Sequence, residues 1–105
     1  MQVLNFEQLE SHGIFEFCYS VRYPKHWNED SAFVDYDDFV LLCPYLEQVI
    51  PNYKYFGPQR VTQKEWKRIE TLALEQNEYK DFFQEIDNWK EKDPENSDFF
   101  WIQGV

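Results

Sequence analysis

The chain has 105 residues with 20 acidic and 10 basic side chains, so its formal net charge is −10 at pH 7. Apolar residues make up 43% of the sequence and aromatic residues 20%, which is enough for one folded domain over residues 1–105 and argues against intrinsic disorder. The negative charge disfavours direct nucleic-acid binding, and no stretch approaches the roughly 18 apolar residues of a membrane span.

The chain is predicted to begin with a short helix and a strand. Asn5, followed by Gln8 and closed by Gly13, predicts a helix at about residues 5–12, although Val3-Leu4 also suits a strand. Over residues 15–23, aromatic and β-branched residues alternate with other residue types until Pro24 ends the pattern. This alternation predicts a strand with one aromatic face on the core, and it puts Glu16 and Cys18 on the other face.

A helix is predicted over residues 39–50, after a loop over residues 24–34. The helix has apolar residues at i, i+3, i+4 and i+7 spacing, namely Phe39, Leu42, Cys43, Leu46, Val49 and Ile50. Asp35 is the predicted N-cap, and Asp38 lies in the first turn. Because Pro44 removes a backbone hydrogen bond, we expect a kinked helix or two short helices, with a strand at 39–43 as the alternative.

The second half is predicted to contain two strands and two helices. Residues 53–56 are a predicted short strand that ends at Gly57-Pro58. Thr62 and Glu65 form a capping-box pattern before a helix over residues 63–76. A further helix is expected at about 78–92, either separated at Asn77 or continuous with the first, and a buried strand at 99–102. These elements predict an α+β fold: a small antiparallel or mixed sheet of about three strands packed against three to four helices.

The sequence offers few groups for catalysis or metal binding. Cys18 and Cys43 form no CxxC pair, and Cys43 falls on the apolar stripe of its predicted helix, so Cys18 is expected to be the more exposed thiol. His12 and His26 each lie beside a predicted turn, without a second ligand one helical turn away. No nucleotide-binding, acyl-transfer or EF-hand motif occurs. We therefore expect no catalytic residue, no metal and no cofactor, and predict that the protein is not an enzyme.

Charge is distributed unevenly along the chain. Residues 1–52 contain nine acids and two bases, whereas residues 53–105 contain eleven acids and eight bases. In the second half, opposite charges recur at helical spacings, as in Glu65 with Arg68, Lys67 with Glu70, and Asp87 with Lys90. Such pairs predict a solvent-exposed helix surface whose charges compensate each other.

Acidic side chains without bases gather in the first half. No lysine or arginine occurs from Trp27 to Asn52, and at least one of Trp27, Phe33 and Tyr36 is expected to be exposed. Uncompensated carboxylates attract a basic partner, and aromatic side chains provide anchors for it. The predicted partner-binding residues are Trp27, Glu29, Asp30, Asp35, Tyr36, Asp37 and Asp38. The alternative is that Asp35 and Asp38 serve only the helix N-terminus. In that case Glu29, Asp30 and Asp37 belong to a solubilising loop.

A second candidate surface lies near the C-terminal end. Asp93, Glu95 and Asp98 precede the apolar run from Phe99 to Ile102, which again places acids beside aromatic residues. Four consecutive apolar residues favour a buried strand over a binding surface at this place.

These features predict a cytoplasmic, acidic inhibitor or immunity-type protein that binds a basic toxin or nuclease and occludes its positively charged cleft. The N-terminus lacks the basic and apolar regions of a secretory signal, which fits this location. In general character the chain is similar to the acidic immunity proteins of bacterial toxin systems, but no family motif transfers individual residues. One alternative is a DNA mimic of the anti-restriction type, against which the interleaved bases of residues 60–92 count. The other is a non-catalytic adaptor domain whose charge serves solubility.

Overall fold

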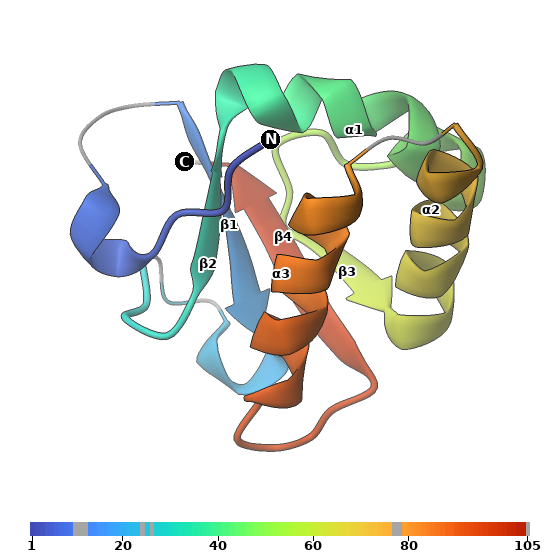
Figure 1. The fold of residues 1–105 in the computed structure, drawn as a ribbon. Coiled ribbons are helices and arrows are strands. Elements are labelled where there is room, and N and C mark those ends of the chain that lie inside the picture. Colours follow the sequence, from blue (N-terminus) through green and yellow to red (C-terminus); the bar gives the residue numbers. More distant parts are fainter. Residues whose placement is uncertain (10–12, 24, 26, 77–78, 105) are drawn as a thin grey trace.

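The computed structural model describes residues 1–9, 13–23, 25, 27–76 and 79–104. They form an α+β fold in which one antiparallel sheet packs against three α-helices, so the predicted class is confirmed (Figure 1). The elements in chain order are η1 (Phe6–Gln8), β1 (Ile14–Tyr19), η2 (Ser20–Arg22), β2 (Ala32–Asp35), α1 (Tyr36–Val49), β3 (Gln59–Thr62), α2 (Gln63–Glu75), α3 (Lys80–Glu91) and β4 (Phe99–Gly104), where η marks a short 3-10 helix. The first predicted helix is confirmed only as η1, which has the Asn5–Gln8 capping box.

The sheet has four strands in the order β2-β1-β4-β3, and all neighbours are antiparallel. Phe17 in β1 lies opposite Ala32 on one side and Ile102 on the other. The additional strand, β2, forms where the sequence predicted the end of a loop. It forms because its backbone pairs with β1 on one side, while Phe33 exchanges two backbone hydrogen bonds with Leu4 on the other. The sheet thus has one strand more than predicted.

The strand predicted at residues 53–56 is wrong. These residues form a turn in which the Gly57 amide donates to the Lys54 carbonyl over 2.8 Å, and β3 begins after the cis Gly57-Pro58 bond. The Tyr53 and Tyr55 side chains pack against the core from this turn. The alternation of apolar residues therefore reflects burial of a turn, which a period of two cannot distinguish from a strand.

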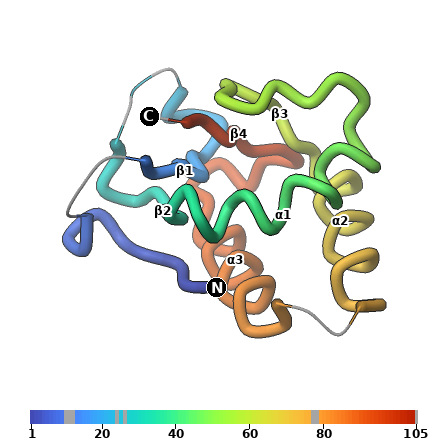
Figure 2. Tube along the Cα trace, turned by 90° about the horizontal axis from the view of Figure 1, so that it is seen from above, coloured from blue at the N-terminus to red at the C-terminus, as the bar shows by residue number. Residues whose placement is uncertain are grey.

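All three helices lie on one side of the sheet (Figure 2). Phe17 is at the centre of this layer, with ring centroids 5.7 Å from Trp66, 6.3 Å from Phe82 and 5.9 Å from Phe100. Edge-to-face and offset pairs of this kind add stabilisation beyond the burial of their area. The aromatic content of the sequence is thus concentrated in the layer between helices and sheet.

Helix α1 is one continuous helix that contains Pro44, so neither two short helices nor a strand at 39–43 forms. Pro44 is exposed, while Phe39, Leu42 and Leu46 are fully buried on the opposite side. Burial of these three side chains, at roughly 1.5–3 kcal/mol each, outweighs the roughly 3 kcal/mol cost of an interior proline. Helices α2 and α3 are separate elements with the predicted capping box at Thr62, and the predicted break at Asn77 lies outside the described residues.

The second face of the sheet is also covered. All six residues of β1 are buried, including Glu16 and Cys18 at 0% exposure. The prediction that Cys18 is the more exposed cysteine is therefore wrong, since Cys43 is 8% exposed. The cause is the segment after β1, which folds back over the outer face and brings Asn28 and Ser31 onto Glu16.

Candidate functional site

The seven residues predicted to bind a partner form two groups at opposite ends of β2 (Figure 1). The loop group, before the strand, contains Trp27, Glu29 and Asp30, and the helix group contains Asp35, Tyr36, Asp37 and Asp38. A strand of four residues is roughly 13 Å long, so the two groups are distinct patches. The acidic stretch is continuous in sequence but divided in space.

The loop group is held in place by the buried carboxylate of Glu16. This carboxylate accepts five hydrogen bonds: from the Trp27 amide at 2.9 Å, the Asn28 amide at 2.9 Å and its side-chain amide at 3.1 Å, the Ser31 hydroxyl at 2.6 Å, and the Gln103 side-chain amide at 3.0 Å. Every partner is a donor, which suits an ionised carboxylate, because that group can only accept. Glu16 therefore joins β1, β4 and the loop through a single side chain.

Cys18 lies beneath the same loop. Its Sγ is 3.7 Å from the side-chain amide of Asn28, and its own thiol donates to the Tyr19 carbonyl. Burial, followed by the charges of Glu16 and Asp30, raises the pKa of Cys18 to about 12. The thiol is thus protonated and covered, which makes it unsuited to nucleophilic chemistry.

Asp30 is charge-compensated, contrary to the prediction for the acidic stretch. The Arg22 guanidinium contacts one Asp30 carboxylate oxygen through Nη2 at 2.9 Å and Nε at 3.0 Å. The Asp30 carbonyl also accepts from the Trp89 indole at 2.8 Å, which ties the loop to α3. Arg22 lies outside the base-free stretch in sequence but reaches it in space because η2 turns the chain back over the sheet.

The acids of the helix group lack a cationic partner among the residues that the structure describes. Within the described part of the chain, none of the ion pairs involves Asp35, Asp37 or Asp38. Asp35 is at the N-cap position of α1, as predicted, but its side chain makes no capping hydrogen bond, whereas Asp38 accepts from the Gln2 amide at 3.2 Å. Asp35 and Asp37 are exposed and Asp38 is half-buried. Three carboxylates therefore sit at the positive end of the helix dipole.

The solvent side of α1 also exposes large apolar side chains. We call this surface the α1 outer face; it consists of Tyr36, Asp37, Val40, Leu41, Pro44 and Glu47. Tyr36, Val40 and Leu41 are 43%, 39% and 48% exposed, and no base is present on the helix. Phe56, 65% exposed, continues the apolar surface beside Tyr55, whose ring contacts Tyr36. Exposed apolar groups among uncompensated acids are typical of a docking surface.

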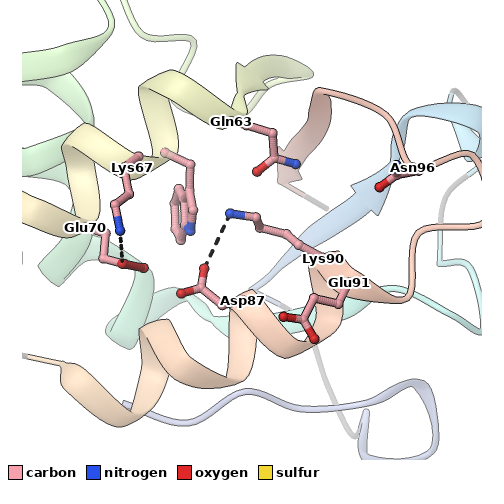
Figure 3. A pocket seen from close by; sticks show the side chains of 8 residues that line it. Gln63, Lys67, Glu70, Asp87, Lys90, Glu91 and Asn96 are labelled. Atoms are coloured by element: carbon pink, nitrogen blue, oxygen red, sulfur yellow. Dashed lines mark hydrogen bonds and ion pairs between the residues drawn. The ribbon is translucent and has the colours of Figure 1, made fainter.

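The face between α2 and α3 has the opposite character (Figure 3). Lys67 contacts Glu70 at 3.6 Å and Lys90 contacts Asp87 at 3.4 Å, so two of the predicted helix pairs are confirmed around a pocket of about 370 Å³. Burial raises the pKa of Glu70, and a hydrogen bond with Asp87 raises it further. The buried indole Nε1 of Trp66, which lines this pocket, has no partner among the described residues. Mutual compensation leaves little net charge here to attract a partner.

At the C-terminal end, the four-residue apolar run does not form a uniformly buried strand. Phe100 and Ile102 are buried, while Phe99 and Trp101 are half-buried on the outer face, where Tyr23 stacks on Trp101 at 4.3 Å. Asp93 accepts from the Glu95 and Ser97 amides and thereby shapes the preceding loop.

Sequence reasoning missed Glu16, Arg22, Val40, Leu41 and Phe56. A single acid between Phe15 and Phe17 would have indicated a buried carboxylate if both faces of the strand had been expected to be covered. Val40 and Leu41 fall outside the apolar arc of their helix, a signal of exposed apolar residues. The pairing of Arg22 with Asp30 gave no comparable signal, because it depends on the path of a loop.

Comparisons with family models, curated proteins and solved structures yield no match for this chain. Among the described residues, no three His, Cys, Asp or Glu side chains come together as a metal site, and His12 and His26 lie outside that set. None of the helices in the described ranges is both long and apolar enough to cross a membrane.

Proposed function

We propose that this protein is a cytoplasmic inhibitor that binds a basic protein partner, a toxin or nuclease, and occludes its positively charged cleft. The observation that supports it best is the α1 outer face, where exposed apolar side chains accompany acids that no base compensates. A cleft that holds nucleic acid carries clustered lysine and arginine side chains, because it must attract phosphates. The same side chains attract a surface of carboxylates.

The acids at the N-terminal end of α1 and the apolar side chains of its outer face have different tasks in the proposed interface. Asp35 and Asp37 accelerate the encounter with a basic surface, and their effect decreases with ionic strength. Tyr36, Val40 and Leu41 lose their contact with water in the complex and supply most of the free energy of binding. Inhibition then follows from coverage of the cleft and needs no catalytic group on this chain.

The test uses charge reversal at two places on the protein. Asp35→Lys combined with Asp37→Lys changes the α1 outer face and its N-cap, whereas Asp81→Lys combined with Glu85→Lys changes exposed positions of α3 by the same total charge. The wild-type protein is immobilised, a lysate of the native host is applied at low salt, and bound proteins are released with salt and identified by mass. A basic protein released in this way is purified, and its nuclease activity and association rate are measured with each variant.

We expect the change in α1 to lower the association rate about tenfold or more at low salt and to relieve inhibition, while the change in α3 has a smaller effect. Equal effects of the two variants would show that only total charge matters and would contradict the α1 site. Release of several unrelated DNA-binding proteins would favour DNA mimicry, and the absence of any salt-sensitive partner would contradict the proposal.

A further inference from the structure

Trp27 has a backbone conformation that is unfavourable for its residue type. Its φ is +55°, in the left-handed region that glycine and asparagine adopt at lower cost. Its side chain is nevertheless 38% exposed, so the position displays a large aromatic group to solvent. Residues in such conformations persist only where the surroundings hold them, and they cluster at binding sites.

The surroundings that hold Trp27 are centred on Glu16. The Trp27 amide donates to one Glu16 carboxylate oxygen, and the Asn28 amide to the other, both at 2.9 Å. Asn28 is 3% exposed, and its side chain also donates to the Lys25 carbonyl at 2.8 Å, which closes the loop on the N-terminal side of Trp27. Among the described residues, the Glu16 carboxylate has no cation partner. Such a carboxylate is costly to bury, and here its hydrogen bonds offset that cost while they fix the backbone of the loop.

We propose that Glu16 is a positioning residue that holds Trp27 as a preformed anchor for the basic partner. This inference rests on the proposed function and adds a second contact area to the α1 outer face. The loop lies over the outer face of the sheet and α1 lies over the other face, and the four residues of β2, roughly 13 Å in length, join them at the edge of the sheet. A standard interface of about 800 Å² per partner is roughly 30 Å across, comparable with the 32 × 28 × 26 Å extents of the molecule, so a partner that reaches around the β2 edge of the sheet contacts both areas.

The loop and the helix should act on different rate constants. Among the described residues, Arg22 pairs with Asp30 beside Trp27 while the exposed Glu29 makes no ion pair, so the loop group adds less long-range attraction than the three acids of the helix group. An anchor side chain that is already in its bound conformation stabilises the complex after contact, which lowers the dissociation rate. Glu16 and Trp27 therefore govern dissociation, whereas Asp35 and Asp37 govern association.

The first part of the test uses the free protein and takes Cys18 as a reporter, because it lies under the loop that Glu16 holds. Native protein is treated with iodoacetamide, and modification of Cys18 and Cys43 is followed by peptide mass. Glu16→Gln, which replaces an acceptor oxygen with a donor, should raise the alkylation rate of Cys18 at least tenfold with less change at Cys43. Ser31→Ala, which removes one of the five hydrogen-bond donors to the Glu16 carboxylate, should raise the alkylation rate of Cys18 less than Glu16→Gln does. Equal rates in the wild type and Glu16→Gln would overturn the positioning role.

The second part measures binding to the basic protein recovered from the host lysate. Trp27→Ala and Glu16→Gln should each raise its dissociation rate about tenfold or more with less than threefold change in association rate. Trp27→Phe should restore part of the residence time, and Leu74→Ala, at the same 38% exposure on α2, is the control and should change neither rate. Unchanged dissociation for Trp27→Ala would overturn the anchor role while leaving the proposed function intact. Recovery of no such protein would overturn the function and the anchor role together, and Cys18 alkylation would still decide the role of Glu16.

Discussion

The loop group and the helix group of the acidic stretch differ in the hydrogen bonds and ion pairs that the rest of the chain makes with them. The loop group before β2 is fixed by the buried carboxylate of Glu16 and has its Asp30 neutralised by Arg22. The helix group after β2 has neither an ion pair nor a side-chain cap for α1. Similar residues thus become a hydrogen-bonded, partly neutralised loop on one side and, among the described residues, an acidic surface without ion pairs on the other. The comparison of the loop group with the helix group shows that the environment of an acidic residue depends on which segments pack against it and not on its neighbours in sequence.

The largest expected change in the free energy of unfolding comes from removing the buried carboxylate of Glu16, whereas removing an exposed carboxylate should have little effect. Glu16→Ala leaves five donors, four of them in buried hydrogen bonds, without this acceptor, so we expect a loss of about 3–5 kcal/mol in the free energy of unfolding. Asp37→Ala removes an exposed side chain and should change the free energy of unfolding by less than about 0.5 kcal/mol. Urea unfolding followed by circular dichroism measures both. Similar values for the two variants would remove the basis for treating the groups as different.

A second prediction concerns the N-cap of α1. Thr62 accepts from the Glu65 amide at 3.1 Å in a reciprocal capping box, so Thr62→Ala should cost about 1 kcal/mol. Asp35 makes no such bond, and Asp35→Ala should cost only the dipole contribution, about 0.3–0.5 kcal/mol. Thermal unfolding of the two single variants tests this. A cost for Asp35→Ala that matched the cost for Thr62→Ala would assign Asp35 to helix capping and remove it from the binding surface.

A smaller effect is expected for the ion pair of the loop group. Because Arg22 and Asp30 are 42% and 37% exposed in their side chains, Arg22→Ala should lower stability at low salt by less than Thr62→Ala does. The difference from wild type should shrink as salt is added, since the pair is screened. Unfolding measured across a salt series checks this. A loss that salt does not change would mean that Arg22 acts through packing of its stem.

The smallest effect is a pH dependence on the compensated α2–α3 face. Burial raises the pKa of Glu70 above its ordinary value of 4.5, so its favourable contribution is complete below that value and is lost as pH rises through the folded-state pKa. Glu70→Gln cannot lose a proton. The stability of this variant relative to wild type should therefore increase slightly from pH 4 to pH 7. A relative stability that decreased over this range would contradict the sign of the shift.

The parts of the fold that could be predicted from sequence are those that depend on neighbouring residues. The capping box at Thr62 and the apolar faces of all three helices are local patterns, and each is confirmed. The turn at residues 53–56 and the burial of Cys18 could not be predicted, because they depend on where distant segments pack. The same holds for the site. Exposure of at least one of Trp27, Phe33 and Tyr36 was expected, and Trp27 and Tyr36 are exposed while Phe33 is buried. The division by β2 and the Arg22 contact follow from the path of the chain.

The position of β4 has a consequence for the order in which the molecule can assemble. This strand follows all other elements in sequence, yet it lies between β1 and β3 and supplies Gln103 to the Glu16 carboxylate. Contacts such as Phe15 with Gly104 span nearly the whole chain, and contacts of such large sequence separation slow folding. During synthesis the helices can form before β4 has been made, whereas the loop that carries Trp27 gains its full set of hydrogen bonds only afterwards. A chain truncated before Phe99 would therefore lack the strand that joins β1 to β3, and it would lack the Gln103 hydrogen bond that completes the Glu16 network under the loop.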